Sequence, residues 1–475
     1  MSNKKWFAVW LFLGALASCN QIDDEVKPQA VVTTPQFQVS PREAANAVRS
    51  MLSEVTAKNT RAGQAQVETR EVGEVIDLAK WKTTRGISNL DADIAQKFYV
   101  VNLKDNQGYA FVSKDKRTFP VYALLDKGTF DASSLENEEL QWRMKLMLNG
   151  FNAEVADFND LCDKIAKEKI SDKATRGNKD DATANTEKVT PEMLSRAGWD
   201  LTAVAPPKMT TTWEQKIKNN CVLNLNGLKK EKLKKISQIP SSNPEVSFGC
   251  TSVAFGQVMY ALREYPGFRD LRYTNGEKVE WGNMSPYSSL EPENQRFLGW
   301  ITANCDPTHW KNGETMIFNI KATEFLRKKL GSYIESRYDN CIAPEGDFDG
   351  YGWSEDERVA KEFFAHPKTC YMIMTAAASN SIDLVNQFNF HYHTYVVDGM
   401  TEHKKTQKYY FLFVKWRKTT TRHTYHVNAG WGGKCNGYYL FVDSSDGFKY
   451  NGSNNRMDYR SKAAYLILRP KQDQP

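Results

Sequence analysis

The chain has 475 residues, a length that suggests two or three domains. Charged residues make up 25% of it and the formal net charge is +6, which is typical of a globular protein and argues against a disordered or strongly basic chain. The basic run Lys229–Lys235 has no interleaved aromatic residues and no nucleic-acid motif. We therefore interpret it as a solvated helix face and expect no nucleic-acid partner.

The N-terminus has the pattern of a secretion signal. Lys4 and Lys5 precede an apolar run from Trp6 to Ala17, which is too short to span a bilayer. Small residues then lead to Cys19, and this arrangement resembles a lipobox, in which the cysteine becomes the lipidated mature N-terminus. We predict a lipoprotein signal peptide over residues 1–18, with a plain signal peptide and an incidental cysteine as the alternative.

A tether follows the signal. Residues 19–36 mix Thr, Gln, Val and Pro with acids and predict a flexible segment. The acidic run Gln21–Glu25 resembles the surface-export signal of some Gram-negative lipoproteins. We expect the protein to be lipid-anchored to the outer membrane and surface-exposed, and the mature domain could be released. No other stretch is long and apolar enough for a transmembrane helix.

Residues 37–167 predict a first folded unit. The spacing of apolar residues from Ala44 to Leu52 predicts a helix, and Phe98–Leu103 with Gly108–Ser113 predicts a β-hairpin. Phe119–Leu124 predicts another strand. Nothing here has catalytic spacing, and a generic small binding domain is an open alternative.

Residues 168–205 predict a linker. The part from Ser171 to Arg196 is rich in Lys, Asp, Thr, Ala and Asn and has few aromatic or β-branched apolar residues. Exposed segments of this kind are where proteolytic cleavage concentrates. We expect a processing site in it.

The segment Ser247–Pro266 predicts a core-facing helix that ends before its proline. Cys250 lies on its first turn, and Gly249 permits a close backbone approach just before it. The partial positive charge of a helix N-terminus favours a thiolate, which is the nucleophilic form of cysteine. A small apolar thiol in the core is the alternative.

The rest of the chain is rich in aromatic residues and strands. We interpret the four tryptophans between residues 267 and 370 as core and cleft wall, not as a cofactor site; they are Trp281, Trp300, Trp310 and Trp353. Strands are predicted over Tyr371–Met374, Tyr409–Trp416, His423–Asn428, Gly437–Val442 and Ala463–Leu468. The segment Glu402–Arg422 is interpreted as an extended hairpin. No set of cysteines or histidines has the spacing of a zinc site, and we expect neither a metal nor a cofactor. The sequence leaves disulfide pairing open.

A cysteine nucleophile needs a base, and His393 begins an alternating strand-like run 143 positions after Cys250. Papain-like hydrolases separate these two residues by roughly 130–150 positions. Asn428 could accept a hydrogen bond from the imidazole and fix its tautomer. His391 and His426 are the competing histidines.

The motifs around Cys250, His393 and Asn428 resemble the streptopain family of secreted papain-like cysteine peptidases, made as inactive zymogens. They are a Gly-Cys-x-Ser helix ending in Tyr-Pro, a His-x-x-Val-x-Asp-Gly strand and a His-Val-Asn-x-Gly-Trp-Gly-Gly turn. The likeness covers the chain from about Thr210 to its end. The pattern around residues 101–115 is similar to the prodomain of the same family. The implied fold is α+β: a papain-like two-lobed catalytic domain over 206–475, with the cysteine in a helical lobe and the histidine in an antiparallel β lobe, preceded by a small α+β inhibitory prodomain.

The resemblance also implies roles for residues outside the cysteine–histidine pair. Gln215, in the stretch Thr212–Gln215, corresponds to a glutamine that helps form the oxyanion hole, with the Cys250 backbone N–H as second donor. A surface glutamine is the alternative. Trp431, Gly432 and Gly433 correspond to cleft residues.

One position departs from the family pattern. Ala429 stands where the family usually has a tryptophan that would shield the hydrogen bond between the histidine and the asparagine. The sequence therefore predicts a membrane-anchored cysteine endopeptidase zymogen that acts on proteins or peptides and is inhibited by its own prodomain. The resemblance to the family also implies a preference for an apolar residue just before the P1 side of the cut. The alternative is a catalytically weak or inactive papain-fold lipoprotein that binds proteins.

Overall fold

The computed structural model describes residues 37–61, 70–85, 90–175, 198–215, 248–309, 315–340, 353–377, 392–411, 414–440 and 463–471. Residues 33–475 form one compact unit. The predicted signal peptide, Cys19, the tether, His391 and the basic run Lys229–Lys235 lie outside the described residues. No helix of the described residues has the length and apolar character needed to cross a membrane.

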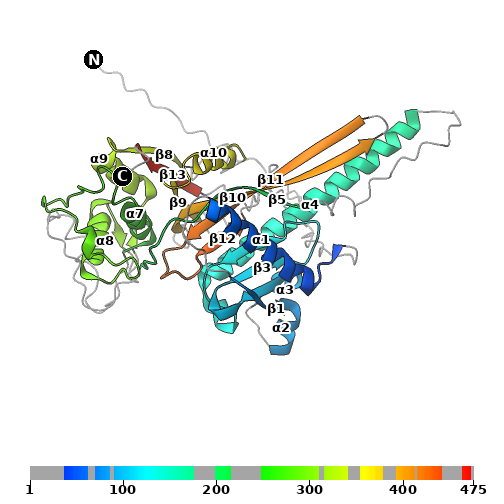
Figure 1. The fold of residues 1–475 in the computed structure, drawn as a ribbon, viewed down its shortest axis with the longest axis horizontal. Coiled ribbons are helices and arrows are strands. Elements are labelled where there is room, and N and C mark those ends of the chain that lie inside the picture. The colour runs from blue at the N-terminus through cyan, green and yellow to red at the C-terminus, as the bar shows by residue number, and fades with distance from the viewer. Residues whose placement is uncertain are drawn as a thin grey trace, which may run out of the picture. The chain divides into compact units, whose positions relative to one another are not determined.

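The N-terminal part is a small antiparallel sheet with helices. In chain order its elements are α1 (Pro41–Arg61), β1 (Val72–Asp77), α2 (Leu78–Arg85), α3 (Ala92–Lys97), β2 (Phe98–Leu103), η2 (Lys104–Asn106), β3 (Tyr109–Ser113), β4 (Val121–Leu125), η3 (Ala132–Glu136) and α4 (Glu138–Thr175) (Figure 1). The predicted helix and hairpin are confirmed, and the predicted strand Phe119–Leu124 corresponds to β4. Asp105 and Asn106 adopt positive φ at the hairpin turn, a conformation that short polar side chains tolerate.

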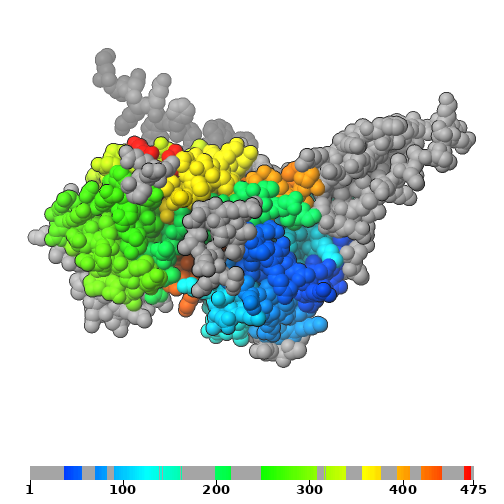
Figure 2. Space-filling model, in the orientation of Figure 1, coloured from blue at the N-terminus to red at the C-terminus, as the bar shows by residue number. Residues whose placement is uncertain are grey.

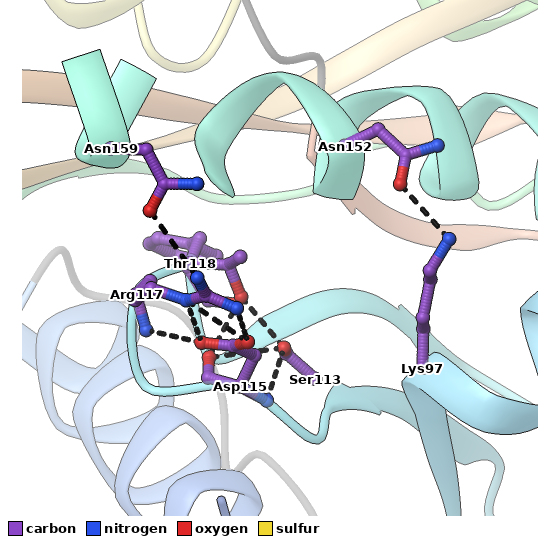
Figure 3. Close-up of polar contacts among 8 residues, drawn as sticks. Lys97, Ser113, Asp115, Arg117, Thr118, Asn152 and Asn159 are labelled. Carbon is purple, nitrogen blue, oxygen red and sulfur yellow. Dashed lines mark hydrogen bonds and ion pairs between the residues drawn. The ribbon is translucent and has the colours of Figure 1, made fainter. Parts of the chain in front are cut away.

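Two asparagines of α4 bind the N-terminal sheet (Figure 3). Asn152 accepts a hydrogen bond from Lys97 Nζ at 3.0 Å, and Asn159 accepts one from Arg117 at 3.3 Å. Arg117 is itself held by a buried ion pair with Asp115 at 2.6 Å. Because both asparagines lie on one helix, these contacts fix α4 against the turn that follows β3 and against the end of α3.

The C-terminal part adds helices and most of the strands. Its elements are β5 (Asp200–Ala205), α7 (Cys250–Ala261), η4 (Trp281–Asn283), α8 (Pro292–Asn304), β6 (Thr308–His309), β7 (Thr315–Met316), α9 (Asn319–Leu330), β8 (Ile334–Asn340), α10 (Trp353–Ala365), β9 (Tyr371–Ala377), β10 (Tyr392–Phe411), β11 (Val414–Asn428), β12 (Gly437–Leu440) and β13 (Ala463–Pro470). The fold is thus mixed, with helices around a large antiparallel sheet.

One sheet of the described residues joins both parts of the chain. Its strand order is β1-β2-β3-β4-β12-β11-β10-β9-β13-β8, and β5 pairs with β10 off this path. The junction is the antiparallel pair of β4 and β12, in which Leu124 lies opposite Tyr438. Helix α10 packs against β10 and β5, and Figure 2 shows its yellow residues beside the green residues of β5. The core of the N-terminal part accordingly extends to a C-terminal residue, Tyr438.

Helix α7 is buried almost all round. Residues 251–260 are all buried, whereas the apolar spacing predicted one core-facing side. Their partners are the helices α8 and α9 on one side and the strands β9 and β10 on the other. The helix ends at Ala261, and a turn covers the remaining residues up to Pro266.

The structure confirms the extended hairpin predicted over Glu402–Arg422, corrects one predicted strand and redraws the ends of the linker. Tyr409–Trp416 is not one strand, because the chain reverses within it and Tyr409 pairs with Trp416 across the β10–β11 hairpin. The aromatic and β-branched composition favours extended backbone on both sides of a tip and hides the turn. Helix α4 continues to Thr175, and β5 already pairs with β10 from Asp200, so both ends of the 168–205 span have regular structure.

Candidate active site

Cys250 is the first residue of α7. Gly249, just before it, has φ +82°, and a Cβ there would lie 2.5 Å from the backbone oxygen of Thr315. Only glycine fits this conformation and this approach without strain. The thiol therefore lies at the N-terminus of a rigid helix, where the helix dipole favours negative charge, and it keeps part of its surface accessible.

His393 on β10 is the partner of this thiol. Its Nε2 donates to the backbone oxygen of Ala429 at 2.8 Å. A carbonyl oxygen only accepts, so Nε2 carries a proton and Nδ1 is the nitrogen left for Cys250, whose thiol hydrogen-bonds to His393. The ring of Trp431 packs edge-on against the imidazole, with centroids 5.6 Å apart.

The environment of Cys250 favours its thiolate. Burial opposes the charged form, but the hydrogen bond and the charge of His393 outweigh it. The backbone N–H and the hydroxyl of Thr394 act in the same direction. The pKa of the Cys250 thiol is consequently lowered from its ordinary value.

Asn428 is buried and lies one residue from the carbonyl that holds His393. Its side-chain amide donates to the backbone oxygen of Thr211 at 2.7 Å, and its side-chain oxygen accepts from Gly430 N–H at 3.1 Å. The hydrogen bond to the imidazole that we expected from Asn428 is made by Ala429 in this structure. A backbone carbonyl has no sequence signature, so the motif could not identify it.

Gln215 lies close to the start of the helix that carries Cys250. Its backbone oxygen accepts from Phe248 N–H at 3.0 Å, two residues before Cys250. The adjacent residue Glu214 forms a β-bridge with Trp431. The segment that carries Gln215 thus connects the start of α7 to the glycine-rich turn.

The glycines of that turn approach the same segment. Gly432 N–H donates to the backbone oxygen of Trp213 at 3.3 Å. Gly433 has φ +82°, and a Cβ there would lie 3.1 Å from a side-chain carbon of Thr212. The structure therefore brings Gln215, Trp431 and both glycines to the edge of the cysteine–histidine pair.

His426, the described competitor of His393, faces two carboxylates. Its Nδ1 lies 2.6 Å from Asp398 and its Nε2 lies 2.7 Å from Asp126. Burial alone would lower the pKa of His426, but the two negative charges raise it to about 10. Both nitrogens are committed to carboxylates, so this imidazole is held as a cation.

Asp398 is a structural residue that the sequence motif contained but did not assign. It is fully buried and accepts from the backbone N–H groups of Lys208 and Met209 at 2.9 and 2.7 Å. The adjacent Gly399 allows the close approach, since a Cβ there would lie 2.8 Å from the nitrogen of Pro207. The Asp-Gly pair thereby attaches the chain leading to Gln215 to the strand that carries His393.

The N-terminal part contacts β11 and β12 close to the charged cluster of His426, Asp398 and Asp126. Asp126 follows β4 and binds His426, and Glu154 of α4 forms a buried ion pair with Arg422 at 3.0 Å. The guanidinium of Arg143 stacks over Tyr439 at 4.1 Å. Several of these groups are charged and buried, so the contact depends on charge pairing as well as on strand pairing.

A further polar cluster lies between α10 and the β10–β11 hairpin. His423 Nδ1 lies 2.6 Å from Asp356, and its Nε2 lies 3.6 Å from Glu402. Burial lowers the pKa of His423, yet the hydrogen bond to Asp356 and the negative charges of both carboxylates raise it to about 9. Within the described ranges, no group of three or more His, Cys, Asp or Glu side chains is arranged to hold a metal ion.

Comparison with known proteins finds a family model that matches the N-terminal part. Residues 36–149 match the family described as Spi protease inhibitor. No curated protein matches the chain. Among solved structures, a prointerpain A fragment from Prevotella intermedia is 14% identical, with a TM-score of 0.42, and the alignment covers 78% of this chain and 94% of that one. The first folded unit of this chain is therefore similar to a protease-inhibitor domain.

Proposed function

We propose that the protein is a cysteine endopeptidase made as a zymogen. The observation that carries the proposal is the pairing of Cys250 at a helix N-terminus with His393, whose far nitrogen is held by the Ala429 carbonyl. A nucleophile, a base and a group that orients the base are the parts that thiol-dependent peptide hydrolysis needs.

In the proposed reaction, Sγ of Cys250 attacks the scissile carbonyl and His393 Nδ1 holds the proton that leaves the thiol. The imidazolium then gives this proton to the departing amine. His393 next takes a proton from the water that hydrolyses the thioester, and the thiolate is released. The Ala429 carbonyl keeps the imidazole in the tautomer that these transfers require.

Negative charge develops on the substrate oxygen in both tetrahedral intermediates. We assign its stabilisation to the Cys250 backbone N–H and the Gln215 side chain, each donor contributing about 2.7–4 kcal/mol. The position of Gln215 beside Phe248 supports this role. Asn428 supports the site through Thr211 and Gly430.

The first folded unit is proposed to be the inhibitory prodomain. Its similarity to a protease-inhibitor family supports this, and so does the strand pairing of β4 with β12, in the same part of the chain as the glycine-rich turn. Substrate would be excluded until the chain is cut between α4 and β5 and the first folded unit leaves. Strand β5 pairs with β10, so we expect the mature N-terminus within residues 176–199.

Cleavage can be tested on the purified full-length protein. We expect a stable fragment whose N-terminal sequence begins in that interval. Cys250→Ala should block self-cleavage and still permit trypsin to cut the same segment. A stable fragment that begins inside residues 37–167, or full activity of the uncut chain, would overturn the zymogen assignment.

The peptidase itself is tested by alkylation. An ordinary cysteine, with a pKa of about 8.5, reacts slowly with iodoacetamide at pH 6, whereas a thiolate–imidazolium pair reacts fast. We expect selective labelling of the Cys250 peptide at pH 6 after the linker is cut and the prodomain is removed. Absence of enhanced labelling would favour a non-catalytic binding lipoprotein.

Cys19 is proposed to carry the membrane anchor. Acyl chains contribute roughly 0.8 kcal/mol per buried methylene, so lipidation would retain the protein at the outer membrane. Cys19→Ala should remove palmitate incorporation and release the protein or leave its precursor uncut. Equal palmitate labelling of the wild type and the variant would contradict this.

A further inference from the structure

Glu214 carries a carboxylate at the edge of the cysteine–histidine pair. Its backbone forms a β-bridge with Trp431, and Oε2 of its side chain lies 3.7 Å from the position that a Cβ on Gly432 would take. The side chain is partly exposed. Among the residues that the structure describes, none forms a hydrogen bond or an ion pair with this carboxylate, Lys434 of the same turn included. The carboxylate is therefore available to a ligand.

The backbone holds Glu214 in place from two sides. Its N–H donates to Ser289 Oγ at 3.3 Å, and the backbone oxygen of the preceding Trp213 accepts from Gly432 N–H at 3.3 Å. The Trp213 ring is fully buried, and its Nε1 donates to the backbone oxygen of Ser285 at 2.8 Å. The carboxylate thus extends from a fixed backbone without being committed to a partner.

Glu214 is close enough to the nucleophile to meet a bound peptide. It adjoins Gln215, whose backbone oxygen accepts from Phe248 N–H, and Phe248 is two residues before Cys250. With about 3.8 Å between successive Cα atoms and about 5.5 Å across the hydrogen-bonded pair, this route limits the Cα distance from Glu214 to Cys250 to about 17 Å. An extended peptide covers that distance in about five residues, so the carboxylate lies within reach of substrate residues near the cut.

The imidazole indicates which half of the substrate meets Glu214. In the proposed reaction His393 gives its proton to the departing amine, so it lies on the leaving-group side of the thiol. Trp431 packs against this imidazole and pairs with Glu214. Glu214 therefore lies along the residues that follow the cut.

We propose that Glu214 binds a lysine or arginine side chain of the substrate on the leaving-group side of the cut and makes the peptidase selective for basic residues there. This inference rests on the proposed peptidase function. A carboxylate attracts substrate cations and repels substrate carboxylates, and partial exposure to water keeps both effects moderate. One partly screened ion pair corresponds to a selectivity of about fivefold.

The test starts from the full-length protein, matured by cutting its linker and removing the prodomain. Wild type, Glu214→Gln and Glu214→Lys are incubated with a synthetic library of randomised peptides, and mass spectrometry identifies the cut positions. We expect the wild type to enrich lysine and arginine within the first few positions after the cut. Glu214→Gln should lose this enrichment, and Glu214→Lys should favour aspartate and glutamate instead.

A single peptide chosen from the library measures the size of the effect. Replacement of its basic residue by glutamine should lower kcat/KM of the wild type about fivefold and should lower that of Glu214→Gln much less. The ratio of the two rates is the readout, because damage to the fold or to the catalytic pair slows both peptides together and leaves their ratio unchanged.

Glu335→Gln is the matched control, because it removes the same charge on β8, which lies three strands from the strand of His393. This variant should keep the preference of the wild type. Cleavage without a preference for basic residues after the cut, or a preference that Glu214→Gln retains, overturns the proposal while leaving the peptidase assignment intact. If the wild type cuts no peptide of the library, the peptidase assignment fails and this inference fails with it.

Discussion

Two histidines on one hairpin show how neighbouring charge decides what an imidazole can do. His393 has a neutral carbonyl on Nε2 and a thiol as its other partner, and it is partly accessible. His426 has a carboxylate on each nitrogen and is buried. The first can accept and release a proton, whereas the second stays a cation with a pKa raised to about 10.

His423 repeats the second arrangement, with Asp356 and Glu402 as partners and a pKa raised to about 9. Three histidines of one hairpin therefore divide into one that is suited to catalysis and two that are suited to structure. The division follows from the partners, since all three lie in similar alternating strand sequence.

The largest effect is expected from His393→Ala. Removal of a general acid–base group costs about 10²–10⁴-fold in rate, so kcat/KM of the C-terminal fragment, separated from the prodomain, for a peptide substrate should fall by at least that range. Labelling of Cys250 at pH 6 should fall with it, because the imidazolium no longer stabilises the thiolate.

His426→Gln is the matched change at the structural histidine. It removes the buried cation and should lower stability while leaving the pH inflection of Cys250 alkylation in place. If it lowered Cys250 reactivity as much as His393→Ala, the distinction between the two histidines would be wrong.

The next effect is a loss of stability in Asp398→Asn. Asp398 is fully buried and balances the His426 cation, and removal of one partner of such a pair costs about 3–5 kcal/mol. Urea unfolding of the full-length protein should show this loss.

Asp126→Asn should cost less, because the Asp126 side chain is 31% exposed and can remain hydrated. Asp126 also belongs to the N-terminal unit, so its effect should vanish once that unit is removed, whereas the effect of Asp398→Asn should remain. Equal destabilisation by the two variants in urea unfolding of the full-length protein, or no destabilisation by Asp398→Asn in the separated C-terminal fragment, would contradict this division.

Much of this architecture follows from sequence pattern. The helix at Cys250 and the hairpin of β2 and β3 depend on local periodicity, and both appear as expected. Motif spacing predicted His393 as the partner of Cys250, and that role stays a prediction. A hairpin was predicted over Glu402–Arg422, but the separate strand prediction for Tyr409–Trp416 ran across its tip, because these residues favour strands on both sides.

The remaining contacts have no local signal. The partner of His393 is a backbone carbonyl, and any residue at position 429 would supply one. Asp126 and His426 are 300 positions apart, and only the pairing of β4 with β12 brings them together. Charge pairing across such a distance depends on tertiary structure, which single-sequence periodicity does not encode.

We predict that the contact between the prodomain and the C-terminal part depends on pH. The pKa of His426 is raised from 6.5 to about 10, so its contribution is complete below about 6.5 and is lost as pH rises through about 10. Burial raises the pKa values of Asp126 and Asp398, but the His426 cation lowers them further, to a net value below 3.8. The stabilisation that these two carboxylates contribute is complete above pH 3.8 and is lost as pH falls through their lowered pKa values.

The cleaved prodomain should therefore stay bound across neutral pH and dissociate at both extremes. Gel filtration of the cleaved complex between pH 2 and 11 measures this. Asp126→Asn should weaken binding of the prodomain at neutral pH and make its release in acid less dependent on pH. If release in acid were the same as in the wild type, other carboxylates would control it.

The smallest effect is expected from Asn428→Ala, and it separates two roles for this residue. If Asn428 orients the imidazole, its loss should move the pH inflection of Cys250 alkylation. In the structure the Ala429 carbonyl holds His393, while Asn428 satisfies the buried Thr211 carbonyl and the Gly430 N–H. Leaving these backbone groups without partners costs about 1–3 kcal/mol. We therefore expect urea unfolding to show that loss of stability, with the pH inflection of Cys250 alkylation unchanged. A shifted inflection at unchanged stability would instead show that Asn428 orients the imidazole.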